Sequence, residues 1–304
     1  MKVLVTGGTV FVSKYVAGYY VNKGYEVYVL NRNSRPQVEG VHLLEADRHN
    51  CREVLKGHYF DAVFDVTAYT AEDIKDLFAG LEAFGQYIMI SSSAVYPETN
   101  LQPFTEEQSV GLNKFWGQYG TDKIGAEVAL LQAVPKAYIL RPPYLYGPMN
   151  NVYREGFVFE CAEKGRKFYI PKDGSMQLQF FHVEDLCKVM DSILEKESAE
   201  HILNVGNEET ISILDWVKMC YDVVGAPLEI VNVDGAVEQR KYFSFYDYEY
   251  KLDVSRQKAL LDKTTDLCAG LKDAYEWYKN NKSEVRQKDF IAFIDENLKL
   301  FCGK

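Results

Sequence analysis

The chain has 304 residues, of which 47% are hydrophobic and 26% are charged. These proportions are typical of a soluble globular protein and exclude a collagen, a coiled coil or a disordered chain. The formal net charge of −10 disfavours nucleic acid as the main partner, because no long Lys/Arg run offsets the repulsion from phosphates. No apolar run approaches the roughly 20 residues of a membrane span, and the start MKVLVTGG lacks a signal-peptide pattern, so we expect a cytoplasmic protein without membrane contact.

The first half of the chain alternates short apolar runs with segments of helical spacing. One such segment covers residues 13–23, with Gly24 as a plausible helix stop. Thr70, followed by Glu72 and Asp73, predicts another helix start. Strands that alternate with helices imply βαβ units, so the predicted fold class is α/β with a doubly wound parallel sheet. The predicted strands are residues 2–6, 26–30, 41–44, 61–66, 86–90 and 138–141.

The pattern loosens after residue 148. Residues 1–148, completed by about 180–205, are predicted to form the first domain. Residues 149–179 and 206–304 mix helices with polar loops and are predicted to form a smaller lid domain. No Pro/Gly/Ser linker separates the two regions, so we expect them to pack together.

The six cysteines lie far apart, without a CxxC pair or a metal-like Cys/His spacing. In a chain of this size they are expected to be buried thiols in a reducing compartment, and no metal is expected. They are Cys51, Cys161, Cys187, Cys220, Cys268 and Cys302.

The loop after the first strand reads TGGTVFVS. The N–H groups and the dipole of a helix that begins there can hold a phosphate. Of the G-x-x-G-x-x-G spacing only Gly7 is kept, since Val10 and Ser13 stand at the other two places. Ser13 is small enough to pack, whereas Val10 places a branched side chain where a pyrophosphate would lie. The loop therefore predicts an altered dinucleotide site, with a plain strand-to-helix turn as the alternative.

The second predicted strand runs into Asn31, Arg32 and Arg35. An acid here would bind a ribose 2′-hydroxyl, whereas an arginine would accommodate a 2′-phosphate, so NADP is slightly favoured over NAD. The alternative is a solvated loop. Asp47, after the third strand, suits an adenine amino group, and an exposed loop acid is its rival interpretation.

Tyr119 and Lys123 lie four residues apart in the run YGTDK, on one face if this segment is helical. A tyrosine titrates near pH 10, and a lysine cation one turn away lowers that pKa. Such a pair can move a proton on a hydroxyl or carbonyl while a hydride moves to or from a nicotinamide. The spacing alone arises by chance in many helices, so its weight depends on what lies nearby.

Three consecutive serines, residues 91–93, follow the strand predicted at 86–90. Ligands bind at the carboxyl ends of parallel strands, and a serine hydroxyl there can hydrogen-bond a substrate oxygen. Serines alone would indicate a polar loop. Together with Tyr119 and Lys123 they predict an active site.

These segments resemble the extended short-chain dehydrogenase/reductase family of NAD(P)-dependent sugar epimerases and dehydratases, over nearly the whole chain. The similar segments are VTGGTVFVSKYV, EADRHN, ISSSAVY, YGTDKIGAE, RPPYLYGP and FFHVEDL. The resemblance implies a Rossmann domain, a sugar-like substrate and a homodimer. It also implies that Tyr119 is the acid/base, that Lys123 contacts the nicotinamide ribose, and that Ser92, four residues before Tyr96, is the catalytic serine with the next serine as second choice.

The resemblance further implies a set of cofactor contacts besides Tyr119 and Lys123. They are Gly7, Gly8, Thr9, Val10, Phe11, Val12, Asn31, Arg32, Asp47, Arg48, Thr67, Ala68, Pro142 and Pro143.

Leu178 departs from the family pattern, because nucleotide-sugar enzymes usually carry a phosphate-holding arginine at this place. A leucine cannot neutralise a diphosphate. The segment around Leu178, the altered glycine loop and the aromatic stretch 242–250 together resemble an atypical branch of the family. That branch is similar to chloroplast stem-loop RNA-binding proteins. His182 is interpreted as structural.

The leading functional prediction is an NAD(P)-dependent epimerase or dehydratase that acts on a hydroxyl or carbonyl of a sugar or nucleotide-sugar-like substrate. The alternative is a non-catalytic nucleotide-binding regulator or RNA-binding relative.

Overall fold

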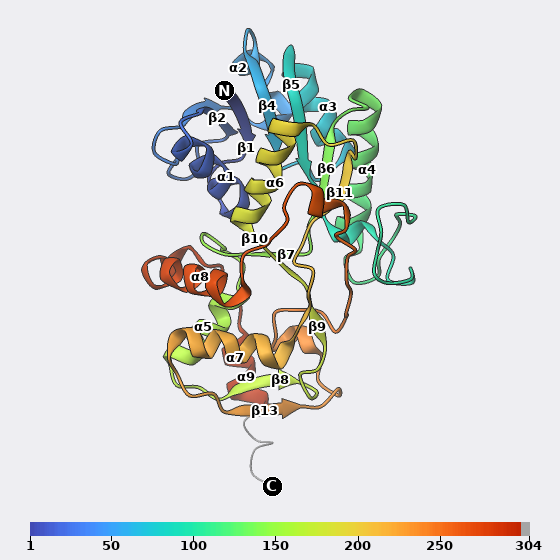
Figure 1. Cartoon of the computed structure of the whole chain (residues 1–304). Coiled ribbons are helices and arrows are strands. Elements are labelled where there is room, and N and C mark those ends of the chain that lie inside the picture. The colour runs from blue at the N-terminus through green and yellow to red at the C-terminus, as the bar shows by residue number, and fades with distance from the viewer. Residues whose placement is uncertain (299–304) are drawn as a thin grey trace. The chain divides into compact units, whose positions relative to one another are not determined.

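The computed structural model describes residues 1–298 (Figure 1). The chain divides into two compact units. The first contains Met1–Leu145, Phe181–Glu208 and Leu252–Thr264, and the second contains Tyr146–Phe180, Glu209–Lys251 and the chain from Thr265 onward. No helix of the described part is long and apolar enough to cross a membrane.

Within residues 1–298, seven strands of the first unit form one sheet in the order β11-β6-β5-β4-β1-β2-β3. Every neighbouring pair in this sheet is parallel, which confirms the predicted doubly wound α/β class. The order reverses at β1, because β2 and β3 extend the sheet on one side of it and the chain then crosses back to add β4, β5, β6 and β11 on the other side. The strands are β1 (Lys2–Thr6), β2 (Glu26–Asn31), β3 (His42–Glu45), β4 (Tyr59–Asp65), β5 (Ala83–Ile90), β6 (Tyr138–Arg141) and β11 (Ile202–Asn204).

Helices cover both faces of this sheet (Figure 1). Helices α1 and α6 contact each other on one face, and α3 and α4 contact each other on the opposite face. The α3–α4 side encloses a buried apolar cluster that includes Leu4, Val63, Met89 and Leu130. The helices are α1 (Phe11–Asn22), α2 (Arg52–Leu55), α3 (Ala71–Gly80), α4 (Gln118–Ala133) and α6 (Val183–Lys196).

Two helix starts test the predicted boundaries. Helix α3 begins directly after Thr70, whose hydroxyl accepts from the Asp73 N–H while the Asp73 carboxylate accepts from the Thr70 N–H, as in a capping box. Helix α1 begins at Phe11, two residues earlier than the apolar spacing predicts. Val10 is therefore the N-cap residue of α1, so its backbone belongs to the helix end as well as to the loop.

The second unit is a smaller α/β unit with an aromatic core. Strands β8 and β13 pair in parallel, and β9 pairs with β12 antiparallel. Its core includes Phe157, Phe168 and Trp216, all fully buried. Its elements are α5 (Glu155–Glu163), β8 (Phe168–Pro171), β9 (Gln177–Leu178), β12 (Ile211–Ser212), α7 (Ile213–Val224), β13 (Ile230–Val233), α8 (Leu267–Asn281) and α9 (Phe290–Asn297), while β7 (Tyr144–Tyr146) and β10 (Phe180–His182) lie where the chain changes units.

Residues 252–264 belong to the first unit, although the sequence pattern assigned them to the second domain. Asp253 donates its N–H to the Phe104 carbonyl at 2.8 Å. The buried Gln257 side chain accepts from the Gly206 N–H at 2.7 Å and donates to the Gly206 carbonyl at 3.0 Å. These bonds join residues far apart in sequence, and apolar periodicity carries no sign of them. The placement of the second unit as a lid stays a prediction.

The cysteines of the described part are free thiols. Cys51, Cys161, Cys187 and Cys220 are buried, as predicted, and Cys268 is half-buried. Cys302 lies outside the described residues.

Candidate active site and cofactor site

Four of the loops that carry predicted site residues follow the carboxyl ends of β1, β4, β5 and β6. In a parallel sheet these ends share one edge, and ligands bind there. The loops concerned start at Gly7, Val66, Ser91 and Pro142. The topology therefore brings to one edge segments as far apart in the sequence as Gly7 and Pro142.

The loop after β1 has a conformation that requires glycine at two places. Gly7 and Gly8 have φ values of +90° and +92°. A Cβ on Gly7 would lie 2.8 Å from the Ser13 Oγ, and a Cβ on Gly8 would lie 2.6 Å from the Val29 Cγ1. The sequence therefore keeps glycine where the backbone itself needs it.

Apart from the missing glycines, the start of α1 has the features that suit the binding of a phosphate. No side chain caps it by a hydrogen bond, and its first turn has no acidic residue. The Ser13 hydroxyl donates to the Val10 carbonyl at 3.0 Å, so it faces the helix backbone. Because N–H groups at a helix start attract anions, this end suits a pyrophosphate, with the Val10 side chain as a neighbour that a glycine would not provide.

The adenosine-side residues are held by protein groups. Asn31 Nδ2 donates to the Gly7 carbonyl at 2.7 Å and to Gln37 Oε1 at 3.0 Å. Arg32 forms an exposed 3.6 Å ion pair with Asp47, and Asp47 also accepts from the His49 N–H at 3.0 Å. Their roles toward a cofactor stay predictions.

Arg48 points inward and forms a buried ion pair with Asp65. Its guanidinium donates to both Asp65 carboxylate oxygens at 3.0 and 3.2 Å and to Thr67 Oγ1 at 3.0 Å. The hydroxyls of Thr6 and Tyr87 also donate to Asp65, at 2.7 and 2.5 Å. Burial raises the pKa of the Asp65 carboxyl, but Arg48 and these hydrogen bonds outweigh burial, so that pKa lies below its ordinary value.

The sequence analysis did not identify Asp65 as part of the site. A lone acid at the end of an apolar strand was its only signal. Thr67 Cγ2 lies within 2.9 Å of where a Gly7 Cβ would stand, so the Arg48–Asp65 cluster directly supports the glycine loop.

Helix α4 carries Tyr119 and Lys123 one turn apart, as the spacing predicts. The Lys123 ammonium is buried and donates to the carbonyls of Ala68 and Ile90 at 2.7 and 2.9 Å. It also lies 4.7 Å from the centroid of the Tyr69 ring. Burial lowers the pKa of Lys123 to about 8, against the opposing pull of Asp65 and other acids.

Tyr119 differs from Lys123 in exposure. The Tyr119 side chain is 40% exposed, and its ring centroid lies 6.4 Å from that of Tyr69. The helix therefore carries an exposed tyrosine one turn before a buried cation. This is the arrangement that a lysine-assisted tyrosine acid/base needs.

Ser92 lies in the turn before the 3₁₀ helix η2 (Ser93–Val95). Its Oγ accepts from the Ala94 N–H at 3.2 Å, which leaves the hydroxyl proton available to a ligand. A Cβ on Gly120 would lie 2.4 Å from the Ala94 carbonyl oxygen, so α4 packs directly against this turn. Pro142 contributes its carbonyl, which accepts from the Ser93 N–H at 2.9 Å.

A buried polar chain fixes the serine turn from behind. The Ser91 hydroxyl donates to Glu127 Oε1 at 2.5 Å, and Arg141 donates to both Glu127 oxygens at 3.0 and 2.5 Å. Arg141 also donates to the Tyr96 hydroxyl at 2.9 Å. The sequence analysis missed Glu127 and Arg141, although Glu127 follows Lys123 by one helical turn.

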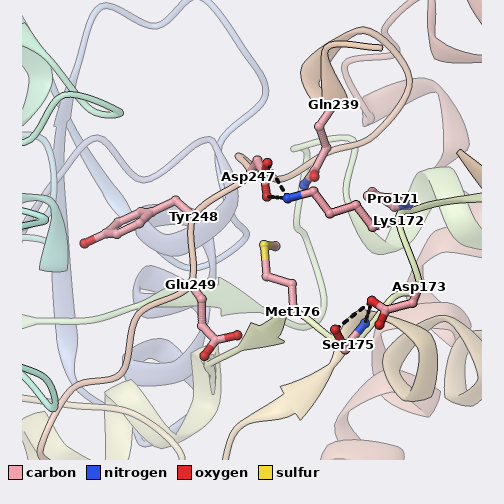
Figure 2. Close-up of a pocket in the computed structure, with 9 residues that line it drawn as sticks. All are labelled: Pro171, Lys172, Asp173, Ser175, Met176, Gln239, Asp247, Tyr248 and Glu249. Carbon is pink, nitrogen blue, oxygen red and sulfur yellow. Dashed lines mark hydrogen bonds and ion pairs between the residues drawn. The ribbon is translucent and has the colours of Figure 1, made fainter. Parts of the chain in front are cut away.

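In the second unit, Leu178 is buried and pairs with Ile211 between β9 and β12. The segment just before Leu178, which departs from the family pattern, borders a cavity of about 250 Å³ (Figure 2). Figure 2 shows that polar groups of this cavity pair with each other, Lys172 with Asp247 and Ser175 with Asp173. The cavity is lined by Pro171, Lys172, Asp173, Ser175, Met176, Gln239, Asp247, Tyr248 and Glu249.

A parallel sheet with a glycine turn at the start of α1, and a Tyr–Lys pair beside a serine turn, defines the class of dinucleotide-binding α/β proteins. The comparison with known families gives the same result. The NAD dependent epimerase/dehydratase family matches residues 3–79 and 72–206, and the chain belongs to that family.

Two relatives of the chain are described with different functions. The chain is 28% identical to the chloroplast stem-loop binding protein of 41 kDa b from Arabidopsis thaliana, over 96% of this chain and 82% of that protein. It is 25% identical to a dTDP-4-dehydro-6-deoxy-D-allose reductase from Streptomyces, over 92% of this chain and 97% of that one.

The solved structures of epimerases share the fold. UDP-glucuronic acid 4-epimerase from Bacillus cereus, in complex with UDP-glucuronic acid and NAD, superposes with a TM-score of 0.73 at 19% identity, covering 92% of this chain and 99% of that one. UDP-glucose 4-epimerase from Thermotoga maritima, with UDP-glucose, also gives 0.73 at 20% identity, covering 93% and 100%.

Proposed function

We propose that the protein is an NAD(P)-dependent epimerase, dehydratase or reductase that acts on a hydroxyl or carbonyl of a sugar or sugar-like substrate. The observation that carries this proposal is the buried Lys123 ammonium, held by two carbonyls one helical turn from the exposed Tyr119. A buried lysine without a carboxylate in direct contact costs stability. A role for its charge at the sheet edge accounts for its presence there.

Each residue has a distinct part in the proposed reaction. A nicotinamide, when bound, accepts or returns a hydride at the substrate carbon. Tyr119 takes the proton from the substrate hydroxyl or returns it to the carbonyl oxygen, and Lys123 stabilises the phenolate. Ser92 donates its hydroxyl proton to the substrate oxygen and so stabilises the charge that develops there.

Either NADP or NAD suits the loop after β2, with NADP slightly favoured. Arg32 is largely exposed, and its pairing with Asp47 is at 3.6 Å, so it remains reachable for a 2′-phosphate. Several of the similar solved structures are described with NAD. A sugar or nucleotide-sugar-like substrate is favoured by those likenesses, while the buried Leu178 gives no phosphate contact. The homodimer and the cytoplasmic location also remain predictions.

Titration of the cofactor-stripped protein with NADH and with NADPH, followed by nicotinamide fluorescence, tests the site first. We expect micromolar binding of at least one of them.

The next test is Tyr119→Phe, which removes the hydroxyl but keeps the ring. We expect turnover of a sugar-nucleotide and sugar panel to fall at least a hundredfold, with cofactor affinity changed less than about twofold.

Tyr59→Phe is the matched control, because Tyr59 is also exposed but lies at the start of β4. It should leave turnover unchanged. Retained activity of Tyr119→Phe would refute the proton role, and failure of both nucleotides to bind would refute the enzyme proposal.

The alternative, a nucleotide-binding regulator or RNA-binding relative without turnover, is favoured by two observations. They are the likeness to a stem-loop binding protein over 96% of this chain and Val10 at the start of α1. Affinity for a hairpin RNA measured against salt tests it. Binding through phosphates weakens steeply as salt rises, whereas the net charge of −10 leads us to expect no such binding at 150 mM salt, roughly the physiological ionic strength.

A further inference from the structure

Tyr69 lies in the turn between β4 and α3 and is 49% exposed, although its backbone is held in place. Its N–H donates to Asp73 Oδ2 at 2.8 Å, and the same oxygen accepts from the Thr70 N–H. The carbonyl of the preceding residue, Ala68, accepts from Lys123 Nζ at 2.7 Å. The turn is therefore bound both to α3 and to α4, and it gives the Tyr69 side chain a fixed origin between them.

The Tyr69 ring lies beside both members of the Tyr–Lys pair. Its centroid is 4.7 Å from the Lys123 ammonium. It is 6.4 Å from the centroid of the Tyr119 ring, with the two ring planes 53° apart. All three residues belong to the first unit. The ring therefore neighbours the two side chains that the proposed reaction uses together.

The Lys123 ammonium has few polar partners for a buried cation. The residue is 2% exposed, and two of its three N–H donors are used by the carbonyls of Ala68 and Ile90. Among residues 1–298, no ion pair joins Lys123 to a carboxylate. A ring face attracts a cation without neutralising its charge. The Tyr69 ring is therefore suited to cover the ammonium and still leave its charge for a reaction.

We propose that Tyr69 is a positioning residue of the active site, whose ring shields the Lys123 ammonium from water and holds it beside Tyr119. This role rests on the function proposed above, because it concerns the cation that is proposed to stabilise the Tyr119 phenolate. Two charges attract each other more strongly where water is excluded, since the effective dielectric constant is lower there. A shielded ammonium therefore stabilises a neighbouring phenolate more than a hydrated one does.

Burial outweighs the charges that act on Lys123. Asp65 of β4, Glu127 of α4 and Asp73 of α3 raise the pKa of the ammonium, and Arg48 lowers it. Burial is the largest effect, and it lowers that pKa to about 8. Removal of a covering ring should raise the pKa again, because water that enters the vacated space restores part of the lost hydration. Replacement by another ring should not.

The titration midpoint of Lys123 tests the shielding directly. NMR of the side-chain ε-carbon in protein with isotope-labelled lysine measures it, and the signal is identified by its loss in Lys123→Met. We expect Tyr69→Ala to raise the midpoint by about one pH unit or more and Tyr69→Phe to leave it unchanged. The matched control is Tyr28→Ala, because the Tyr28 ring lies 4.5 Å from the Lys2 ammonium in the same unit. This control should leave the Lys123 midpoint unchanged, whereas an unchanged or lowered midpoint in Tyr69→Ala would overturn the shielding.

Cofactor binding and turnover form the second arm. In Tyr69→Ala, the pH above which NADH affinity declines should rise together with the Lys123 midpoint. Turnover of the sugar panel should fall at least tenfold in Tyr69→Ala and be retained in Tyr69→Phe.

The two arms separate this role from the proposed function. If Tyr119→Phe abolishes turnover while Tyr69→Ala changes neither the midpoint nor turnover, the function stands and the role of Tyr69 is refuted. If the midpoint shifts as expected but neither NADH nor NADPH binds, the function fails, and the shielding of Lys123 by Tyr69 stands without it.

Discussion

At the scale of single residues, burial of the Lys123 ammonium costs stability, and the same ammonium is the cation that the proposed reaction uses. Its ammonium is removed from water and receives two carbonyl oxygens and an aromatic face in exchange. Carbonyl dipoles replace part of its hydration, and the remainder of the cost appears as a pKa lowered to about 8. The charge is thus retained at neutral pH and lost at mildly alkaline pH.

Lys123→Met should remove this pH dependence. Between about pH 8 and the ordinary lysine value of 10.5, the unfolded chain binds more protons at this position than the folded protein does. The contribution of Lys123 to stability therefore rises with pH across this window. Urea unfolding at pH 7 and pH 9.5 should show the unaltered protein gaining about 2 kcal/mol relative to Lys123→Met, since one pKa unit corresponds to about 1.4 kcal/mol. Parallel pH curves for the two proteins would contradict the lowered pKa.

The same deprotonation removes the cation proposed to contact the cofactor. NADH or NADPH affinity should therefore decline above about pH 8 in the unaltered protein. Lys123→Met should bind weakly at every pH. An affinity that stays constant from pH 7 to pH 9.5 would argue against the ribose contact.

Arg48 and Arg32 offer a matched comparison of a buried and an exposed ion pair. Arg48→Ala would leave the fully buried Asp65 without its cation, so we expect a loss of about 3–5 kcal/mol in the free energy of unfolding. Arg32→Ala removes a largely exposed partner of Asp47 and should cost less than about 1 kcal/mol. Urea denaturation measures both. Similar losses in the two variants would refute the structural role assigned to Arg48.

At the scale of elements, helix α4 depends on one glycine for its position. Gly120 permits close contact with the serine turn, because a Cβ there would lie 2.4 Å from the Ala94 carbonyl oxygen. Gly125, one turn and a half later, has Ala71 Cβ as its nearest neighbour at 3.8 Å, which is an ordinary contact. The same substitution should therefore have opposite effects at the two positions.

Gly120→Ala should lower the thermal midpoint and weaken NADH binding, since α4 must move away from the serine turn and carry Lys123 with it. Gly125→Ala should raise stability by up to about 1 kcal/mol through helix propensity and leave binding unchanged. Calorimetry and the fluorescence titration read both effects. Equal behaviour of the two variants would show that the close contact does not position the helix.

The elements that the sequence predicts well are those set by local rules. Strand β1 is predicted at its observed bounds because its five residues are apolar except at the ends, and α3 is predicted by its cap at Thr70. The three-residue strand β11 is too short to give a pattern and was not predicted. The placement of Tyr119 and Lys123 one turn apart on α4 could be predicted because helical spacing is local, whereas the inward orientation of Arg48 depends on Asp65, on a different strand.

At the scale of the whole molecule, the first unit is discontinuous, and residues 252–264 complete it. No property of that segment on its own indicates where it lies. Its position depends on hydrogen bonds such as those of Gln257 with Gly206. The predicted domains are also discontinuous, but nothing in the sequence pattern indicates that this segment returns to the first unit.

Gln257→Ala should measure how firmly this segment is held. The change leaves the N–H and the carbonyl of Gly206 without the partners they have at 2.7 and 3.0 Å. We expect a loss of about 2–3 kcal/mol in the free energy of unfolding, because both groups are buried. Gln132→Ala on the exposed side of α4 is the control and should be near neutral. A loss of less than about 0.5 kcal/mol for Gln257→Ala would mean that the segment is only loosely attached.

The late return of residues 252–264 has a consequence for how the protein is made. A ribosome releases the chain from the N-terminus onward, and domains generally fold as units in that order. Here the first unit lacks the partner of Gly206 until residue 257 has emerged, by which point residues 209–251 of the second unit have already been synthesised. The first unit therefore stays incomplete while residues 209–251 of the second unit are translated, and we expect the two units to finish folding at nearly the same time.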